Sequence, residues 1–203
     1  SFDRERMRFE TSLRRMDEIV SSPNRTQNRL NENPSVQHHF ENAADTDPAL
    51  PNNRDWIRQV LAQAKALEGK LPTHEELVAK AAIDSIELEN LVHKAKEASG
   101  AWGSDASKRS EVILNAGVEL AKSRGLLLQL MISEAGKTFA EADSEMSEAI
   151  DFANFYAASI DEIREIETRD GVKFKPHQVV VVTPPWNFPV AIAAGGVLSA
   201  LAA

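Results

Sequence analysis

The 203-residue sequence contains no cysteine. Disulfide bonds, cysteine-ligated metal sites and a thiol nucleophile are therefore excluded within these residues. Basic residues are fewer than acidic ones, and the formal net charge is −8. A negative net charge disfavours a general nucleic-acid-binding surface. The pattern predicts neither a signal peptide nor a transmembrane segment, since the long apolar run near the C-terminus is rich in Ala and Gly and indicates a buried helix.

Apolar residues recur at helical spacing through most of the chain. Thr73 and Glu76 form a capping-box pattern at one predicted helix start, and Gly136 is placed to end a helix with a positive φ. We also expect Gly100 to stop a helix. The predicted helices cover residues 1–20, 55–67, 73–82, 84–100, 105–124, 125–136 and 137–157, and a short alternating strand is predicted over 172–175.

Four consecutive valines, residues 179–182, predict a strand buried on both faces, and the two prolines that follow end it. Residues 190–203 predict an apolar helix, in which the pair 195–196 (Gly-Gly) is expected to permit close packing. The unit is strand, tight turn and helix, which indicates an α/β fold that is otherwise mostly helical. Trp186 and Asn187 lie in the turn, where open α/β folds bind ligands.

The pentapeptide Pro-Trp-Asn-Phe-Pro at residues 185–189 resembles the corresponding motif of the aldehyde dehydrogenase superfamily. The resemblance implies that Asn187 contributes its side-chain amide to the oxyanion hole for the thiohemiacetal that a catalytic Cys forms. Such a neutral donor is worth roughly 10²–10³ in rate elsewhere. It also implies that Phe188 contacts the substrate and that NAD is bordered by Thr183, Pro184, Pro185 and Trp186. The plainer interpretation is that Trp186 and Phe188 are core aromatics at a strand end.

Residues 94–156 resemble the N-terminal region of the same family. The segment Glu-Ala-Ile-Asp-Phe, residues 148–152, is close to the sequence of members that act on semialdehydes. In those members a Glu on this helix lies beside the substrate tunnel, and Glu148 is the matching residue. For nearly all other residues of this region the expected role is helix packing.

A charged helix opens the chain, and its Arg14-Arg15 pair resembles the last helix of proline dehydrogenase barrels. The resemblance implies that the two arginines hold the substrate carboxylate, a task that suits the bidentate geometry of guanidinium. The alternative is a solvated helix face with ion pairs such as Arg14 with Glu18.

Residues 21–53 are rich in Pro, Asn and Asp and lack periodic apolar residues, which is typical of an interdomain linker. The segment resembles the connection between the two catalytic modules in the proline utilisation A family of bifunctional enzymes. His38 and His39 are adjacent, and no further ligand cluster accompanies them, so no metal site is predicted.

These resemblances together suggest a fragment of a bifunctional enzyme of that family. The expected parts are the C-terminal helix of a proline dehydrogenase-like module (1–20), a linker (21–53) and the N-terminal part of an aldehyde dehydrogenase domain with the first strand-turn-helix of its NAD-binding domain (54–203). We expect a fragment because the first residue is not Met and the final apolar helix has no cap.

By resemblance, the intact enzyme would oxidise proline with FAD in a module outside this chain. It would then oxidise L-glutamate γ-semialdehyde to glutamate with NAD. We expect a cytoplasmic homo-oligomer with small-molecule substrates when the protein is full length, and no dehydrogenase activity from these residues alone, because they lack the nucleophilic Cys.

Two other hypotheses remain open at this level. One is a single-function aldehyde dehydrogenase of another substrate class that carries an unrelated helical extension. The other is a non-catalytic helical interaction protein, in which residues 185–189 merely cap a strand and the apolar C-terminal helix binds a partner.

Overall fold

A computed structural model describes residues 1–18, 26–37 and 39–203. The expected module boundary after residue 20 and the side chain of His38 lie outside this description. All regular secondary structure of the described residues is helical. The helices are α1 (Phe2–Arg14), the 3₁₀ helix η1 (Met16–Glu18), α2 (Pro51–Leu67), α3 (His74–Ala81), α4 (Ser85–Ser104), α5 (Ala106–Lys122), α6 (Arg124–Ala135), α7 (Phe139–Asp170) and α8 (Ala191–Ala202).

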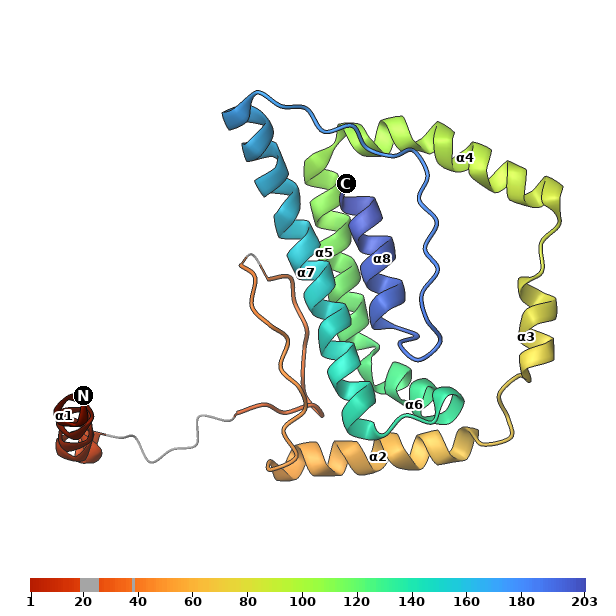
Figure 1. Cartoon of the computed structure of the whole chain (residues 1–203). Coiled ribbons are helices and arrows are strands. Elements are labelled where there is room, and N and C mark those ends of the chain that lie inside the picture. Colours follow the sequence, from red (N-terminus) through yellow and green to blue (C-terminus); the bar gives the residue numbers. More distant parts are fainter. Residues whose placement is uncertain (19–25, 38) are drawn as a thin grey trace.

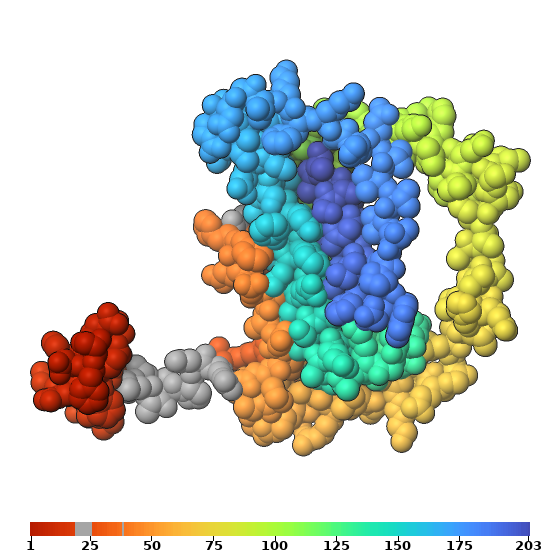
Figure 2. All heavy atoms as spheres, viewed as in Figure 1, coloured from red at the N-terminus to blue at the C-terminus, as the bar shows by residue number. Residues whose placement is uncertain are grey.

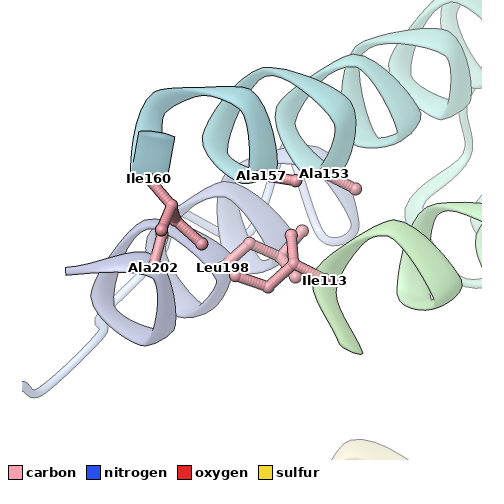
Figure 3. Close-up of a cluster of buried hydrophobic side chains, with 6 residues drawn as sticks. All are labelled: Ile113, Ala153, Ala157, Ile160, Leu198 and Ala202. Atoms are coloured by element: carbon pink, nitrogen blue, oxygen red, sulfur yellow. The ribbon is translucent and has the colours of Figure 1, made fainter. Parts of the chain in front are cut away.

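The long helix α7 is the centre of the molecule, with α5 and α8 packed along it (Figure 1). Small residues on α7 allow a close approach, and a Cβ added at Gly117 of α5 would lie 3.0 Å from the Cβ of Ala153. The apolar cluster between these three helices appears in Figure 3 and consists of Ile113, Ala153, Ala157, Ile160, Leu198 and Ala202.

A second apolar cluster joins α2 and α6 to the first half of α7. Trp56 of α2 meets Phe139 of α7 edge to face, with ring centroids 5.9 Å apart. The buried members are Val60, Leu128, Met131, Ala142 and Met146. This cluster fixes the end of α7 on which the candidate site is built.

Local signals placed most helix ends correctly. The capping box of Thr73 and Glu76 is present, and Gly136 follows α6 with φ of 66°. The prediction that Gly100 stops a helix was wrong, because α4 continues through it to Ser104. Helix α7 also extends well beyond residue 157, and it ends at Gly171, where φ is 65°.

The predicted strands do not form, and the strand–turn–helix unit therefore has only its turn and its helix. Residues 179–182 are extended but unpaired, and Val181 is 80% exposed. A strand needs a neighbour that accepts and donates its backbone hydrogen bonds, and no described segment pairs with residues 172–175 or 179–182. The described residues are thus mostly helical, as expected, but they lack the expected strand, and the α/β class of the whole domain stays a prediction.

Residues 26–37 and 39–50 lie beside α7 (Figure 1) and are joined to it by polar contacts. Asp151 accepts hydrogen bonds from the Asn42 amide (2.7 Å) and the Ala43 backbone (2.6 Å). Asp143 accepts from the backbone (2.5 Å) and hydroxyl (2.8 Å) of Thr46. We call residues 26–37 and 39–50 the strap, and these contacts attach it to α7.

On the other side of the molecule, α3 and the first part of α4 form an arm that is separated from the 172–190 segment in Figure 2. The arm carries several exposed apolar side chains, namely Leu77, Val78, Ile83, Ile86, Leu88 and Leu91.

None of the described helices is long and apolar enough to cross a membrane.

Candidate functional site

The turn at residues 186–190 connects the extended segment to α8. Helix α8 begins at Ala191, with Val190 as its N-cap residue, and it has neither a side-chain cap nor an acidic residue of its own in the first turn. An acceptor comes instead from α7. The Glu145 carboxylate oxygen Oε1 accepts hydrogen bonds from the backbone of Val190 (2.7 Å) and Ala191 (3.0 Å).

Between this turn and the start of α7 lies a pocket of about 660 Å³. Asn187 is exposed at its edge, and Trp186 is 81% exposed. The lining residues are Ala135, Gly136, Lys137, Ala140, Glu141, Ser144, Glu145, Glu148, Trp186, Asn187 and Phe188. A ligand in this pocket would therefore meet the Asn187 amide on one side and charged groups of α7 on the other.

Lys137 links the two walls of this pocket. Its ammonium group lies 4.5 Å from the centroid of the Phe188 ring, a cation–π arrangement. The same group forms an ion pair with Glu145, whose side chain is fully buried. Glu148 is half-buried one turn further along α7. The pocket thus offers a cation and a neutral amide near Phe188, and the carboxylates of Glu141 and Glu148 on α7 in addition to the paired Glu145.

A separate pocket of about 270 Å³ lies between α7, α8 and residues 182–184. It is lined by Phe152, Tyr156, Val182, Thr183, Pro184, Ile192, Gly195, Gly196 and Ser199. The two glycines permit close packing, as predicted. A Cβ at Gly195 would lie 2.8 Å from the Phe152 ring, and one at Gly196 would lie 2.5 Å from Val182 Cγ1.

Most site residues expected from the sequence lie at one of the two pockets. Trp186, Asn187, Phe188 and Glu148 line the larger pocket. Thr183 and Pro184 line the smaller one, and Pro185 lies between them in the chain.

The paired arginines are not brought to either pocket. Arg14 ends α1 and Arg15 follows it, and no residue of that helix is buried. Figure 1 shows α1 apart from the helices that carry the turn. The Arg15 guanidinium pairs with Glu18 at 2.9 Å, so this segment has the character of a charged helix face.

Sequence reasoning missed Lys137 and Glu145. A signal for Glu145 was available, because it is a charged residue at a position that shares the apolar face of α7 with Ala142 and Ala149. A carboxylate on such a face requires a buried partner. The identity of that partner could not be read from periodicity, since Val190 and Ala191 are 45 and 46 residues away.

Comparison with known proteins gives a consistent result. The family model described as "Aldehyde dehydrogenase family" matches residues 60–203. A 1-pyrroline-5-carboxylate dehydrogenase 2 from Bacillus subtilis is 32% identical over 146 residues, which cover 68% of this chain and 28% of the relative. A bifunctional protein PutA from Salmonella typhimurium is 34% identical over 118 residues, covering 58% of this chain and 9% of the relative.

Two solved structures share the fold. Proline utilization A (PutA) from Corynebacterium freiburgense has a TM-score of 0.58 and 37% identity, and the match covers 83% of this chain and 16% of that one. A 1-pyrroline-5-carboxylate dehydrogenase from Thermus thermophilus has a TM-score of 0.62 and 21% identity, covering 83% and 39%. The chain spans at most a third of the first curated relatives it matches, with shares of 28%, 33% and 9%.

Proposed function

Because this chain belongs to the aldehyde dehydrogenase family, we propose that it forms part of an enzyme that oxidises L-glutamate γ-semialdehyde to glutamate with NAD. The relatives named 1-pyrroline-5-carboxylate dehydrogenase support this substrate, since that compound is the cyclic imine of the semialdehyde. The observation that carries the proposal is the placement of Asn187 at the edge of a pocket of about 660 Å³, beside Phe188 and opposite Glu148.

The nucleophile must come from outside these 203 residues, because they contain no cysteine. The small share of the relatives that the chain spans supports a longer polypeptide. A Cys thiolate supplied by that polypeptide attacks the aldehyde carbon, and negative charge develops on the carbonyl oxygen. The Asn187 amide donates a hydrogen bond to this oxygen. The amide is suited to this role because it is exposed toward the pocket and, among the described residues, no hydrogen bond occupies it.

The smaller pocket supplies one wall of the proposed cofactor site. Thr183 and Pro184 line this pocket together with residues of α7 and α8. In the proposal NAD contacts Thr183 and Pro184 here and extends along Pro185 to Trp186, which lines the larger pocket. When bound, NAD would accept the hydride, and water would then hydrolyse the resulting Cys thioester, which releases glutamate and restores the thiol.

The test is a pair of variants in the longer polypeptide that contains this chain. We expect Asn187→Ala to lower kcat for NADH production from glutamate semialdehyde by about 10²–10³. Asn90→Ala, an exposed asparagine on α4, is the matched control and should retain the wild-type rate. The 203-residue chain alone should produce no NADH. Equal kcat values for both variants, or NADH production by the short chain, would contradict the proposal.

We further propose that the longer polypeptide is bifunctional and oxidises proline with FAD in a preceding module. The similarity to PutA from two organisms supports this reading. In it, Arg14 and Arg15 belong to the proline site, and the strap continues the connection between modules. The discriminating measurement is proline-dependent dye reduction by the longer polypeptide. Its absence, with semialdehyde oxidation intact, would favour a single-function dehydrogenase.

A further inference from the structure

Glu145 is a fully buried carboxylate whose polar contacts join the 186–190 turn, the start of α8 and Lys137. One oxygen accepts two backbone N–H groups, from Val190 at 2.7 Å and Ala191 at 3.0 Å. The other accepts from the Lys137 ammonium. The first N–H groups of a helix have no partner within the helix. A charged acceptor there forms strong, short hydrogen bonds and interacts favourably with the helix dipole.

These contacts hold the turn that carries Asn187 at two places. The backbone of Val190, three residues after Asn187, is bonded directly to Glu145. Phe188, the next residue after Asn187, lies under the ammonium of Lys137, and Glu145 holds that ammonium in place. Trp186 and Asn187 themselves are exposed. The position of the turn therefore depends on an anchor outside it.

We propose that Glu145 is a positioning residue that aims the Asn187 amide into the pocket. The inference rests on the oxyanion role proposed above for Asn187. Glu145 acts through the backbone of Val190 and Ala191 and through Lys137, and it touches neither the reacting aldehyde nor the cofactor. Replacing it releases the first turn of α8 and the Phe188 side of the pocket together, because both attachments share this carboxylate.

The experiment compares three variants in the longer polypeptide. Glu145→Ala removes both attachments. Glu145→Gln keeps an oxygen for Val190 and Ala191 but turns an amide NH₂ toward Lys137. Asp143→Asn is the matched control, since Asp143 is a buried carboxylate on the same helix that instead binds Arg124 and Thr46.

We expect kcat, normalised to the folded fraction, to fall about 10²-fold in Glu145→Ala, because a displacement of the order of 1 Å can have that cost. The normalised kcat of Glu145→Gln should lie between those of Glu145→Ala and the wild type, with little change in KM for the aldehyde. Asp143→Asn should lower stability while its normalised kcat stays at the wild-type value. A purely structural role for Glu145 would make normalised kcat equal in all variants, and that outcome would overturn the proposal.

A second readout does not depend on activity. In the 203-residue chain, amide hydrogen exchange of Val190 and Ala191 and the NMR signal of the Asn187 side-chain amide report the anchor directly. Glu145→Gln should shift the Asn187 signal, and Glu145→Ala should also speed exchange, whereas Asp143→Asn should do neither. Unchanged signals in both Glu145 variants would overturn the anchoring. If the signals change as expected but Asn187→Ala retains full kcat, the oxyanion role fails while the anchor stands.

Discussion

The guanidinium of Arg124 and the carboxylate of Asp143 meet at 2.8 Å with both side chains only 3% exposed. Arg124 also donates to the Asp143 backbone oxygen (3.0 Å) and to Ser147 Oγ (3.1 Å). Burial lowers the pKa of Arg124, and the nearby charge of Arg29 lowers it further, whereas Asp143 opposes both effects. Thr46 binds the same carboxylate. One buried ion pair therefore joins α6, α7 and the strap.

Removing one partner of this pair should be costly. We expect Asp143→Ala to lower the free energy of unfolding by about 3–5 kcal/mol, because it leaves the Arg124 charge buried and uncompensated. The matched control is Asp161→Ala, which breaks an exposed pair with Arg164 in the same helix and should cost less than about 1 kcal/mol. Urea unfolding followed by circular dichroism measures both. Similar losses in the two variants would refute the role of the buried pair.

The contact between α5 and α7 should not tolerate a methyl group at Gly117. The added Cβ would lie 3.0 Å from the Cβ of Ala153, which cannot rotate away, so the helices must separate. We expect Gly117→Ala to destabilise the chain by about 1–3 kcal/mol despite the better helix propensity of Ala. Gly125→Ala is the control, since its Cβ would make an ordinary 3.6 Å contact with Trp56. Thermal unfolding should give a higher Tm for Gly125→Ala than for Gly117→Ala. A higher Tm for Gly117→Ala would exclude a steric contact with Ala153 as the cause.

The N-terminus of α7 should weaken in acid. Hydrogen bonds from the backbone N–H and hydroxyl of Thr138, both 2.8 Å, hold the pKa of the Glu141 carboxyl below its ordinary value. Because the folded pKa is the lower one, this contact stabilises the fold above the unfolded pKa and is lost as pH falls through the folded pKa.

An NMR titration of the Glu141 carboxyl tests this directly. Thr138→Ala removes the hydroxyl donor but keeps the backbone donor, so the pKa of Glu141 should rise part of the way toward its ordinary value. A Glu141 pKa that is already at or above the ordinary value in the unaltered chain would show that the capping box does not act in this way.

Helix ends show which features could be predicted from neighbouring residues. The capping box at Thr73 joins groups three residues apart and the left-handed Gly136 bonds to a carbonyl five residues back, and both features were predicted correctly. Gly100 was misjudged because a tertiary contact favours the longer helix. Trp102, two residues further, donates a hydrogen bond of 2.8 Å to the backbone oxygen of Leu201 in α8. A single glycine costs only about 1 kcal/mol in a helix, which such a contact can offset.

The sequence predicted some residues of the candidate site and missed others. The pentapeptide motif identified Asn187 and its neighbours, and the structure places Trp186, Asn187 and Phe188 together with Glu148 on one pocket. Their catalytic and binding roles stay predictions. Lys137 and Glu145 were missed because their contacts with Phe188, Val190 and Ala191 cross about 45 to 51 positions of the chain, and only the packing of α8 against α7 brings these residues together.

By itself the sequence determined the helical segments, several of their caps, the family motif and the absence of a thiol nucleophile. These follow from residue identity or from hydrogen bonds that close within a few positions. Only the tertiary structure decided that residues 179–182 remain unpaired, that the strap is bound to α7, and that Glu145 caps α8. The physical reason is that a strand ladder, a buried ion pair and a cap from another helix each need a partner whose position is set by packing and not by the local sequence.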